Sequence, residues 1–215
     1  MTVDDIKLLR LAGQHLTAKT GKLAAARDLC GYQAQFYRNA WHAARLRTAE
    51  PLSPDTWGEG LVKSWGQRGT VHVFPESDLP LFIRARKTPR EVCDSGWYPF
   101  LLSMGIYISP ERNQYFAQLI ADAIHEGRDT REELKQICFA HGLTESEAEH
   151  VFNQWGGTIA ELAGIGVLCF KVQEKKAYAL CPPFEPMPGR PRSWRSPGAI
   201  SRTSARPPCG TSPIS

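Results

Sequence analysis

Signals for the start of helices in the second half of the chain limit most strongly what this sequence can fold into. Ser109 can cap a helix that has Pro110 at its first position, and Gly127 is suited to end that helix. Between them, apolar residues recur at the spacing of one helical face. A long amphipathic helix is therefore predicted, with its apolar face formed by Phe116, Leu119, Ile120, Ala123 and Ile124.

Two capping boxes follow this helix. Thr130 is followed by Glu133, and Thr144 by Glu147, at the spacing that lets side chains and backbone amides cap each other. Each box opens a short amphipathic stretch. The apolar residues are Leu134, Ile137 and Cys138 in the first stretch, and Val151, Phe152 and Trp155 in the second. Three successive helices are thus predicted in this half.

A β-hairpin is predicted after the three helices. The apolar residues 167–170 are followed by the polar residues 171–176 and by a second strand-like segment, 177–181. Three helices followed by a hairpin are the order of elements in a winged helix.

The first half repeats this order. Thr2 and Asp5 can open a helix, which predicts one face formed by Ile6, Leu9, Gly13 and Leu16. Residues 23–30 predict a second helix. Residues 61–65 and 70–74 then flank a loop with glycines at both ends, which predicts a hairpin with Arg68 near its tip.

The predicted fold class is mainly α with short β-hairpins, arranged as tandem winged-helix (helix-turn-helix) modules. The expected division is a first module over residues 1–105, a second over 106–187, and a disordered segment over 188–215. The last 28 residues contain six prolines, six serines, five arginines and three glycines, which cannot form a core. A second hypothesis is that a frameshift near Met187 replaced a further module, because such a composition also arises from out-of-frame reading of a GC-rich gene.

The distribution of charge favours DNA binding more than the net charge of +4 does. Residues 1–90 hold 14 Lys and Arg against 8 Asp and Glu, whereas residues 91–187 hold 7 against 14. The basic surface is therefore expected on the first half, although solvated surfaces commonly show an imbalance of this size.

Other sequence features predict neither a membrane segment nor a metal site. No stretch approaches the roughly 18 uninterrupted apolar residues of a membrane helix, and residues 1–10 carry two aspartates and no apolar signal core. A cytoplasmic location is expected. Six cysteines lack the paired spacing of metal ligands, so they are interpreted as buried free thiols, and no cofactor is expected. They are Cys30, Cys93, Cys138, Cys169, Cys181 and Cys209.

Residues 31–35, Gly-Tyr-Gln-Ala-Gln, are the candidate chemical motif. In an extended segment, alternation points Gln33 and Gln35 to the same side, so that two amides can converge on one site. For an arbitrary Gln-x-Gln, the simpler interpretation is that both amides satisfy backbone groups in a bend.

The context of this motif resembles a known family. Residues 11–16, the 31–35 motif, the 40–47 helix, Lys63-Ser64-Trp65 and residues 68–72 together resemble the AlkZ/YcaQ-type winged-helix DNA glycosylases. The resemblance covers most of residues 6–187 and is strongest in the first 85. It implies three tandem winged helices around a DNA-binding channel, and it places Gln33 and Gln35 at the family's catalytic Gln-hydrophobic-Gln motif. From this resemblance, we expect the family's third module to be missing from this chain.

The implied activity is excision of alkylated or crosslinked purines from double-stranded DNA, without a metal. Glutamine does not titrate and cannot act as a general base, but its amide can orient water by donating and accepting hydrogen bonds. An N7- or N3-alkylated purine is cationic and leaves with little help, so positioning water and stabilising charge are sufficient.

Several basic residues are candidates for contacts to DNA. Arg38, Arg45 and Arg47 can extend a basic face beside the glutamines, and Arg68 can contact a phosphate. For each arginine taken alone, a solvated surface charge is the favoured interpretation. His72 can bind DNA or orient a neighbour, although a histidine in an apolar strand is more often structural. Trp57, Trp65, Trp97 and Trp155 can stack on bases, but core packing is the favoured interpretation.

Two other functions remain open at this stage. A winged helix also serves non-catalytic regulators, so a DNA-binding or transcription regulatory protein is the main alternative. An inactive truncated product with an exposed apolar interface is the third.

Overall fold

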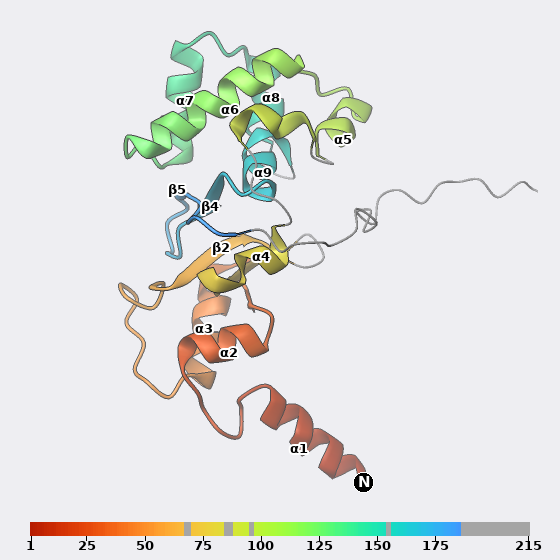
Figure 1. The fold of residues 1–215 in the computed structure, drawn as a ribbon, viewed down its shortest axis with the longest axis vertical. Coiled ribbons are helices and arrows are strands. Elements are labelled where there is room, and N and C mark those ends of the chain that lie inside the picture. Colours follow the sequence, from red (N-terminus) through yellow and green to blue (C-terminus); the bar gives the residue numbers. More distant parts are fainter. Residues whose placement is uncertain (67–69, 84–87, 95–96, 154–155, 186–215) are drawn as a thin grey trace, which may run out of the picture.

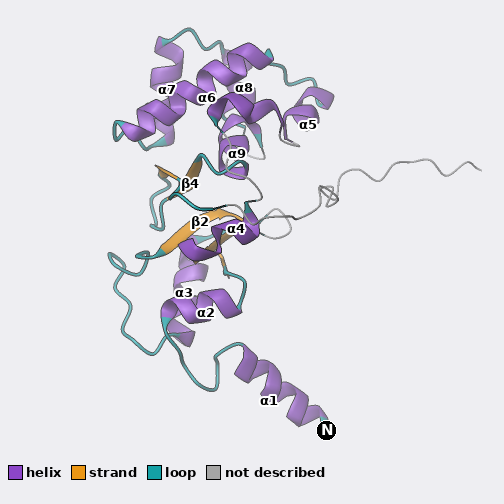
Figure 2. Cartoon of the chain, in the orientation of Figure 1, coloured by secondary structure: helices purple, strands orange, loops and turns teal. Residues whose placement is uncertain are grey.

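The structure is a computed structural model that describes residues 1–66, 70–83, 88–94, 97–153 and 156–185. The chain is mainly helical with one small antiparallel sheet, as the sequence predicts. Helices and sheet are arranged in layers, with α2 and α3 on one side of the sheet and α5–α9 on the other (Figures 1 and 2). Arg68 and Trp155 lie outside the described residues, as does the segment after Glu185.

Within the described residues, the first half contains three helices and three strands before a series of short helical turns. These elements are α1 (Val3–Gly13), α2 (Lys22–Asp28), β1 (Tyr32–Gln33), α3 (Tyr37–Arg47), β2 (Leu61–Trp65) and β3 (Val71–Pro75). The hairpin predicted at 61–65 and 70–74 is confirmed by β2 and β3, which pair from Leu61 opposite Pro75 to Trp65 opposite Val71. Short helical turns follow: η2 (Glu76–Asp78), α4 (Leu79–Phe82) and η3 (Pro89–Asp94).

The second half follows its capping signals closely. It comprises α5 (Trp97–Ser103), α6 (Pro110–His125), α7 (Arg131–Ala140), α8 (Glu145–Val151), α9 (Gly157–Gly164), β4 (Leu168–Phe170) and β5 (Tyr178–Leu180). Ser109 caps α6, and both predicted capping boxes are formed at α7 and α8. The predicted hairpin is confirmed by β4 and β5.

Helix α9 was not predicted from the sequence, and its environment explains why. All of its residues from Gly157 to Ala163 are buried. A helix buried on every side has no polar face, so its sequence lacks the periodicity that marks an amphipathic helix.

Helix α1 was predicted from the sequence, but its predicted apolar face is not buried. Its capping box between Thr2 and Asp5 is formed, yet none of its residues is buried. The expected apolar face contacts no core, since Leu9 is 64% exposed. The helix stands away from the body of the molecule (Figure 1).

The sheet joins the two halves of the chain. Its strand order is β1-β3-β2-β4-β5, and Lys63 of β2 lies opposite Phe170 of β4. Because β2 belongs to the first half and β4 to the second, the two predicted hairpins form one continuous antiparallel sheet.

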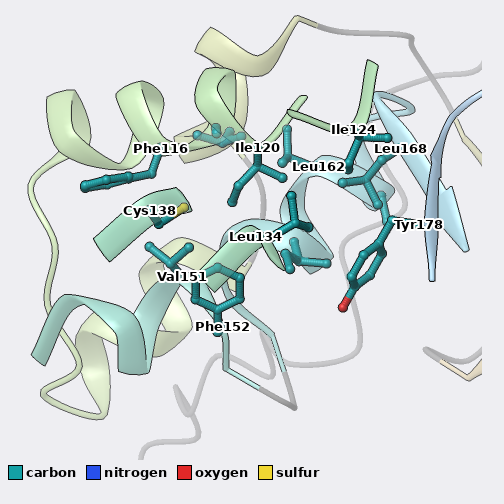
Figure 3. Packing of buried hydrophobic residues seen from close by; sticks show 14 of the residues in the cluster. Phe116, Ile120, Ile124, Leu134, Cys138, Val151, Phe152, Leu162, Leu168 and Tyr178 are labelled. Carbon is teal, nitrogen blue, oxygen red and sulfur yellow. The ribbon is translucent and has the colours of Figure 1, made fainter. Parts of the chain in front are cut away.

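The largest core fills the space among the helices of the second half (Figure 3). Phe116, Leu134 and Leu162 come from three different helices and are completely buried. Strands β4 and β5 close this core with Leu168 and Tyr178. Two smaller clusters are built around the sheet and include residues of the first half.

The cysteines only partly match their predicted burial. Cys138, Cys169 and Cys181 are buried, and burial raises the pKa of Cys138 and of Cys169 to about 12. Cys30 is exposed, which corrects the prediction, because it lies in the turn before β1 rather than in a helix face. Cys209 lies outside the described residues.

Candidate functional site

The turn before β1 brings the glutamine motif to the edge of the sheet. Cys30 and Gly31 both adopt positive φ values, 55° and 96°. A Cβ atom at Gly31 would lie 3.2 Å from the Cβ of His72 and 3.2 Å from the carbonyl oxygen of Val73. A glycine is therefore required both for the backbone conformation and for the close approach of this turn to β3.

Gln33 and Gln35 are both exposed, and the residues that alternate with them are buried. Tyr32 and Ala34 are only 2% and 1% exposed. Gln33 lies opposite His72 in the β1–β3 pair, and the amide of Ala34 donates to the carbonyl oxygen of Val71 at 2.8 Å. This extended pairing leaves the two glutamine side chains free of the core.

A hollow of about 590 Å³ lies beside this motif. Both halves of the chain line it, which the β2–β4 pairing makes possible. Gln35 is on its wall, whereas Gln33 is not among its lining residues. The other lining residues are Ala34, Phe36, Tyr37, Arg38, Asn39, Lys63, Trp65, Val71, Phe170, Glu174 and Lys176.

Cations and aromatic rings dominate the lining of this hollow. The lining includes three cationic side chains, those of Arg38, Lys63 and Lys176, and one carboxylate, that of Glu174. Arg38 and Glu174 form an ion pair with 2.9 Å between Nε and Oε1. Phe36 is 70% exposed next to Gln35. A hollow lined by an amide, an excess of cations and several aromatic rings, one of them exposed, is suited to an anionic ligand that carries a flat ring.

Burial and like charge together affect the two lysines. Burial lowers the pKa of Lys63, and the nearby ammonium of Lys176 lowers it further. Burial also lowers the pKa of Lys176, and the charge of Arg131 adds to this effect against the opposing effect of Glu132.

Two other residues predicted to contact DNA, Arg45 and Arg47, differ in exposure. Arg45 is exposed, and its guanidinium lies 5.9 Å from the centre of the Trp41 ring. Arg47 is half-buried and donates to the carbonyl oxygen of Ala43 at 2.9 Å. Neither arginine lines the hollow, whereas Arg38 does.

His72 lies within the β2–β3 hairpin. Its side chain is largely buried, and Nδ1 donates to the carbonyl oxygen of Thr70 at 2.9 Å. A Cβ atom at Gly66 would come within 2.7 Å of the same nitrogen, so the ring packs directly against that glycine. These contacts favour the structural interpretation of His72.

The tryptophans differ in burial and position. Trp57 is 1% exposed and its indole N–H donates to the hydroxyl of Tyr37 at 3.0 Å, which confirms its place in the core. Trp65 is half-buried and lines the hollow. The side chains of Trp97 and Trp155 lie outside the described residues.

Sequence reasoning missed the contribution of the second half to this site. Phe170, Glu174 and Lys176 reach the hollow only because β4 pairs with β2. Lys63 did carry a local signal, since it is a lysine within the apolar strand 61–65. No group of three or more His, Cys, Asp or Glu residues that could hold a metal occurs in the part of the chain that the structure describes. In that part, no helix is long and apolar enough to cross a membrane.

Comparisons with known proteins point to one kind of protein. No family model matches the chain. A curated relative, an interstrand DNA cross-link repair glycosylase of Streptomyces sahachiroi, is 26% identical over 145 residues. The solved structure of the DNA glycosylase AlkZ from the same organism matches with a TM-score of 0.59 and 26% identity, over 80% of this chain. The resemblance to AlkZ/YcaQ-type DNA glycosylases is confirmed.

The match to AlkZ covers different shares of the proteins compared. The match to the curated relative includes 66% of this chain but 38% of that protein. The match to the solved structure includes 47% of the AlkZ chain. The chain therefore spans less than half the length of the AlkZ proteins that it matches.

Proposed function

We propose that this chain is the part of a DNA glycosylase that binds double-stranded DNA and hydrolyses the N-glycosidic bond of alkylated or crosslinked purines. In this proposal the two halves are tandem winged-helix modules, and Gln33 and Gln35 position the attacking water. The observation that carries the proposal is the place of Gln35 on the wall of a hollow rich in cations and aromatic rings. The similarity to AlkZ supports it.

The chemistry follows from what a glutamine amide can do. The amide carries a carbonyl acceptor and two N–H donors, so it can hold a water molecule and direct one lone pair toward the sugar. It supplies no titrating base. The reaction therefore relies on the cationic purine as an activated leaving group and on charge stabilisation around the developing oxocarbenium ion.

The decisive experiment is release of modified base from alkylated duplex DNA under single-turnover conditions. Wild-type chain is compared with Gln33→Ala and Gln35→Ala, and Gln136→Ala is the matched control because that glutamine is exposed on α7 outside the hollow. Loss of a water-positioning amide should lower the rate by about 100-fold or more. The control should match the wild type.

Two results would contradict the catalytic proposal. Equal base release by wild type and both glutamine variants would remove Gln33 and Gln35 from the reaction. An absence of release together with intact binding to undamaged duplex would favour a non-catalytic DNA-binding protein. That outcome would agree with the position of Gln33 outside the hollow.

A further inference from the structure

Two lysines from different halves of the chain lie beside Phe170 in the hollow. Lys63 lies in β2 directly opposite Phe170 of β4. The ammonium of Lys176, which comes from the turn between β4 and β5, lies 5.7 Å from the centre of the Phe170 ring. Both lysines line the hollow that contains Gln35.

The lysine pair lacks a carboxylate partner among the described residues. Lys63 is half-buried within the sheet, and among the described residues no side chain forms an ion pair or hydrogen bond with it. Glu174 lines the same hollow, but its carboxylate pairs with Arg38. Lys63 is half-buried, whereas Lys176 is exposed. Two cations held near each other repel, and a bound anion relieves that repulsion.

We propose that Lys63 and Lys176 together bind one backbone phosphate of the DNA strand that presents its base to Gln35. This inference rests on the proposed function, because it takes DNA as the ligand. A DNA strand carries one phosphate per nucleotide, so a strand that enters the hollow brings an anion to the lysines. The ammonium of Lys176 lowers the pKa of Lys63, which agrees with this arrangement.

The site would exist only when the two halves are joined. Lys63 comes from the first hairpin and Lys176 from the second, and the β2–β4 pair sets the position of one against the other. A phosphate bound there would hold the strand across the boundary between the halves. Such a contact positions the DNA and carries no information about base sequence.

The test measures affinity for duplex DNA that contains a non-cleavable abasic-site analogue, over a series of salt concentrations. The variants are Lys63→Met and Lys176→Met, because methionine keeps most of the length of the lysine stem and removes the charge. Lys175→Met is the matched control, since that lysine is exposed on the same turn but does not line the hollow. Thermal unfolding checks that each variant is folded.

Lys63→Met and Lys176→Met should each weaken DNA binding by about five- to tenfold at 0.1 M salt. Each should also reduce the slope of log affinity against log salt concentration by about 1. A second set of duplexes replaces single phosphates by neutral methylphosphonates near the analogue. At one position the neutral duplex should bind the wild type and the lysine variants equally, because the contact is then already absent.

Several results would overturn the proposal. Folded variants with unchanged affinity and slope would show that the lysines do not contact DNA. The same loss at every methylphosphonate position would show a diffuse field instead of one phosphate. Binding of inorganic phosphate to the wild type but to neither lysine variant, with equal duplex affinity in all three, would assign the site to a free phosphate. Base release is measured separately, so a chain that binds through the lysine pair but excises nothing would overturn only the catalytic proposal.

Discussion

The two halves of this chain are stabilised in different ways. In the second half, α6, α7 and α8 all have side-chain caps, and large apolar residues from five helices and two strands share one core. In the first half, α2 and α3 have no side-chain cap, and their buried faces consist of alanines such as Ala26 and Ala40. The second half therefore acts as the scaffold, and the first half supplies the glutamine motif on a thinner core.

The candidate site therefore lies mainly on the half of the chain that has the smaller core. The first half lines most of the hollow, but β4 and the turn after it complete the lining. Stability of the second half thus supports the geometry of residues that lie in the first half. The following changes test that dependence.

The largest effect is expected from Leu134→Ala in α7. Leu134 is completely buried in the large core, so its truncation should lower the free energy of unfolding by about 2–5 kcal/mol. Leu9→Ala in α1 is the matched control, because the same truncation at a residue that is 64% exposed should change stability by less than about 0.5 kcal/mol. Denaturant unfolding measures both. Similar losses at the two positions would mean that α1 packs as firmly as α7 does.

A smaller effect is expected from Gly31→Ala in the turn before β1. The new Cβ atom meets both a left-handed backbone conformation and close contacts with β3, so a loss of about 1–3 kcal/mol is expected. The pairing of Gln33 with His72 should be disturbed as well, which would lower base release in the single-turnover assay.

Gly105→Ala separates the two causes of that loss. Gly105 also has a positive φ, 77°, but a Cβ atom there would have no neighbour within 4 Å. The difference between the two variants therefore measures the close approach of the turn to β3. An equal loss at both positions, with base release unchanged in Gly31→Ala, would show that this approach does not matter for the site.

The smallest of these effects concerns Glu147, which caps α8 and bonds to Arg112 of α6. A hydrogen bond from Arg112 and the capping contacts with Thr144 hold the pKa of Glu147 at about 2. Glu147→Gln should lower the free energy of unfolding by about 1–2 kcal/mol at neutral pH. This carboxylate stabilises the fold above its ordinary pKa of 4.5, and its contribution is lost as the pH falls toward 2.

The measurement is unfolding of wild type and Glu147→Gln between pH 7 and pH 2. The difference between them should shrink below pH 4.5 and nearly vanish near pH 2. Glu149→Gln is the control, because this exposed neighbour on α8 makes no contact with Arg112. A difference that stays constant over the whole range would assign the effect to packing instead of charge.

The sequence determined the elements whose signals are local. Ser109, Thr130 and Thr144 mark helix starts because a capping side chain bonds to an amide only two or three residues away. The two hairpins were also predictable, since alternating segments on either side of a polar or glycine-rich loop pair with each other directly. The exposed alternation of Gln33 and Gln35 has the same local origin.

Only the tertiary structure decided which of these elements meet. Helix α9 gave no amphipathic signal because packing surrounds it, and α1 gave a clear signal although none of its residues is buried. Lys176 reaches Lys63 through the β2–β4 pair, which joins residues more than one hundred positions apart in the chain. A local pattern shows that a side chain is available for a role. Long-range strand pairing decides which side chains share a site, because it depends on the packing of the whole chain.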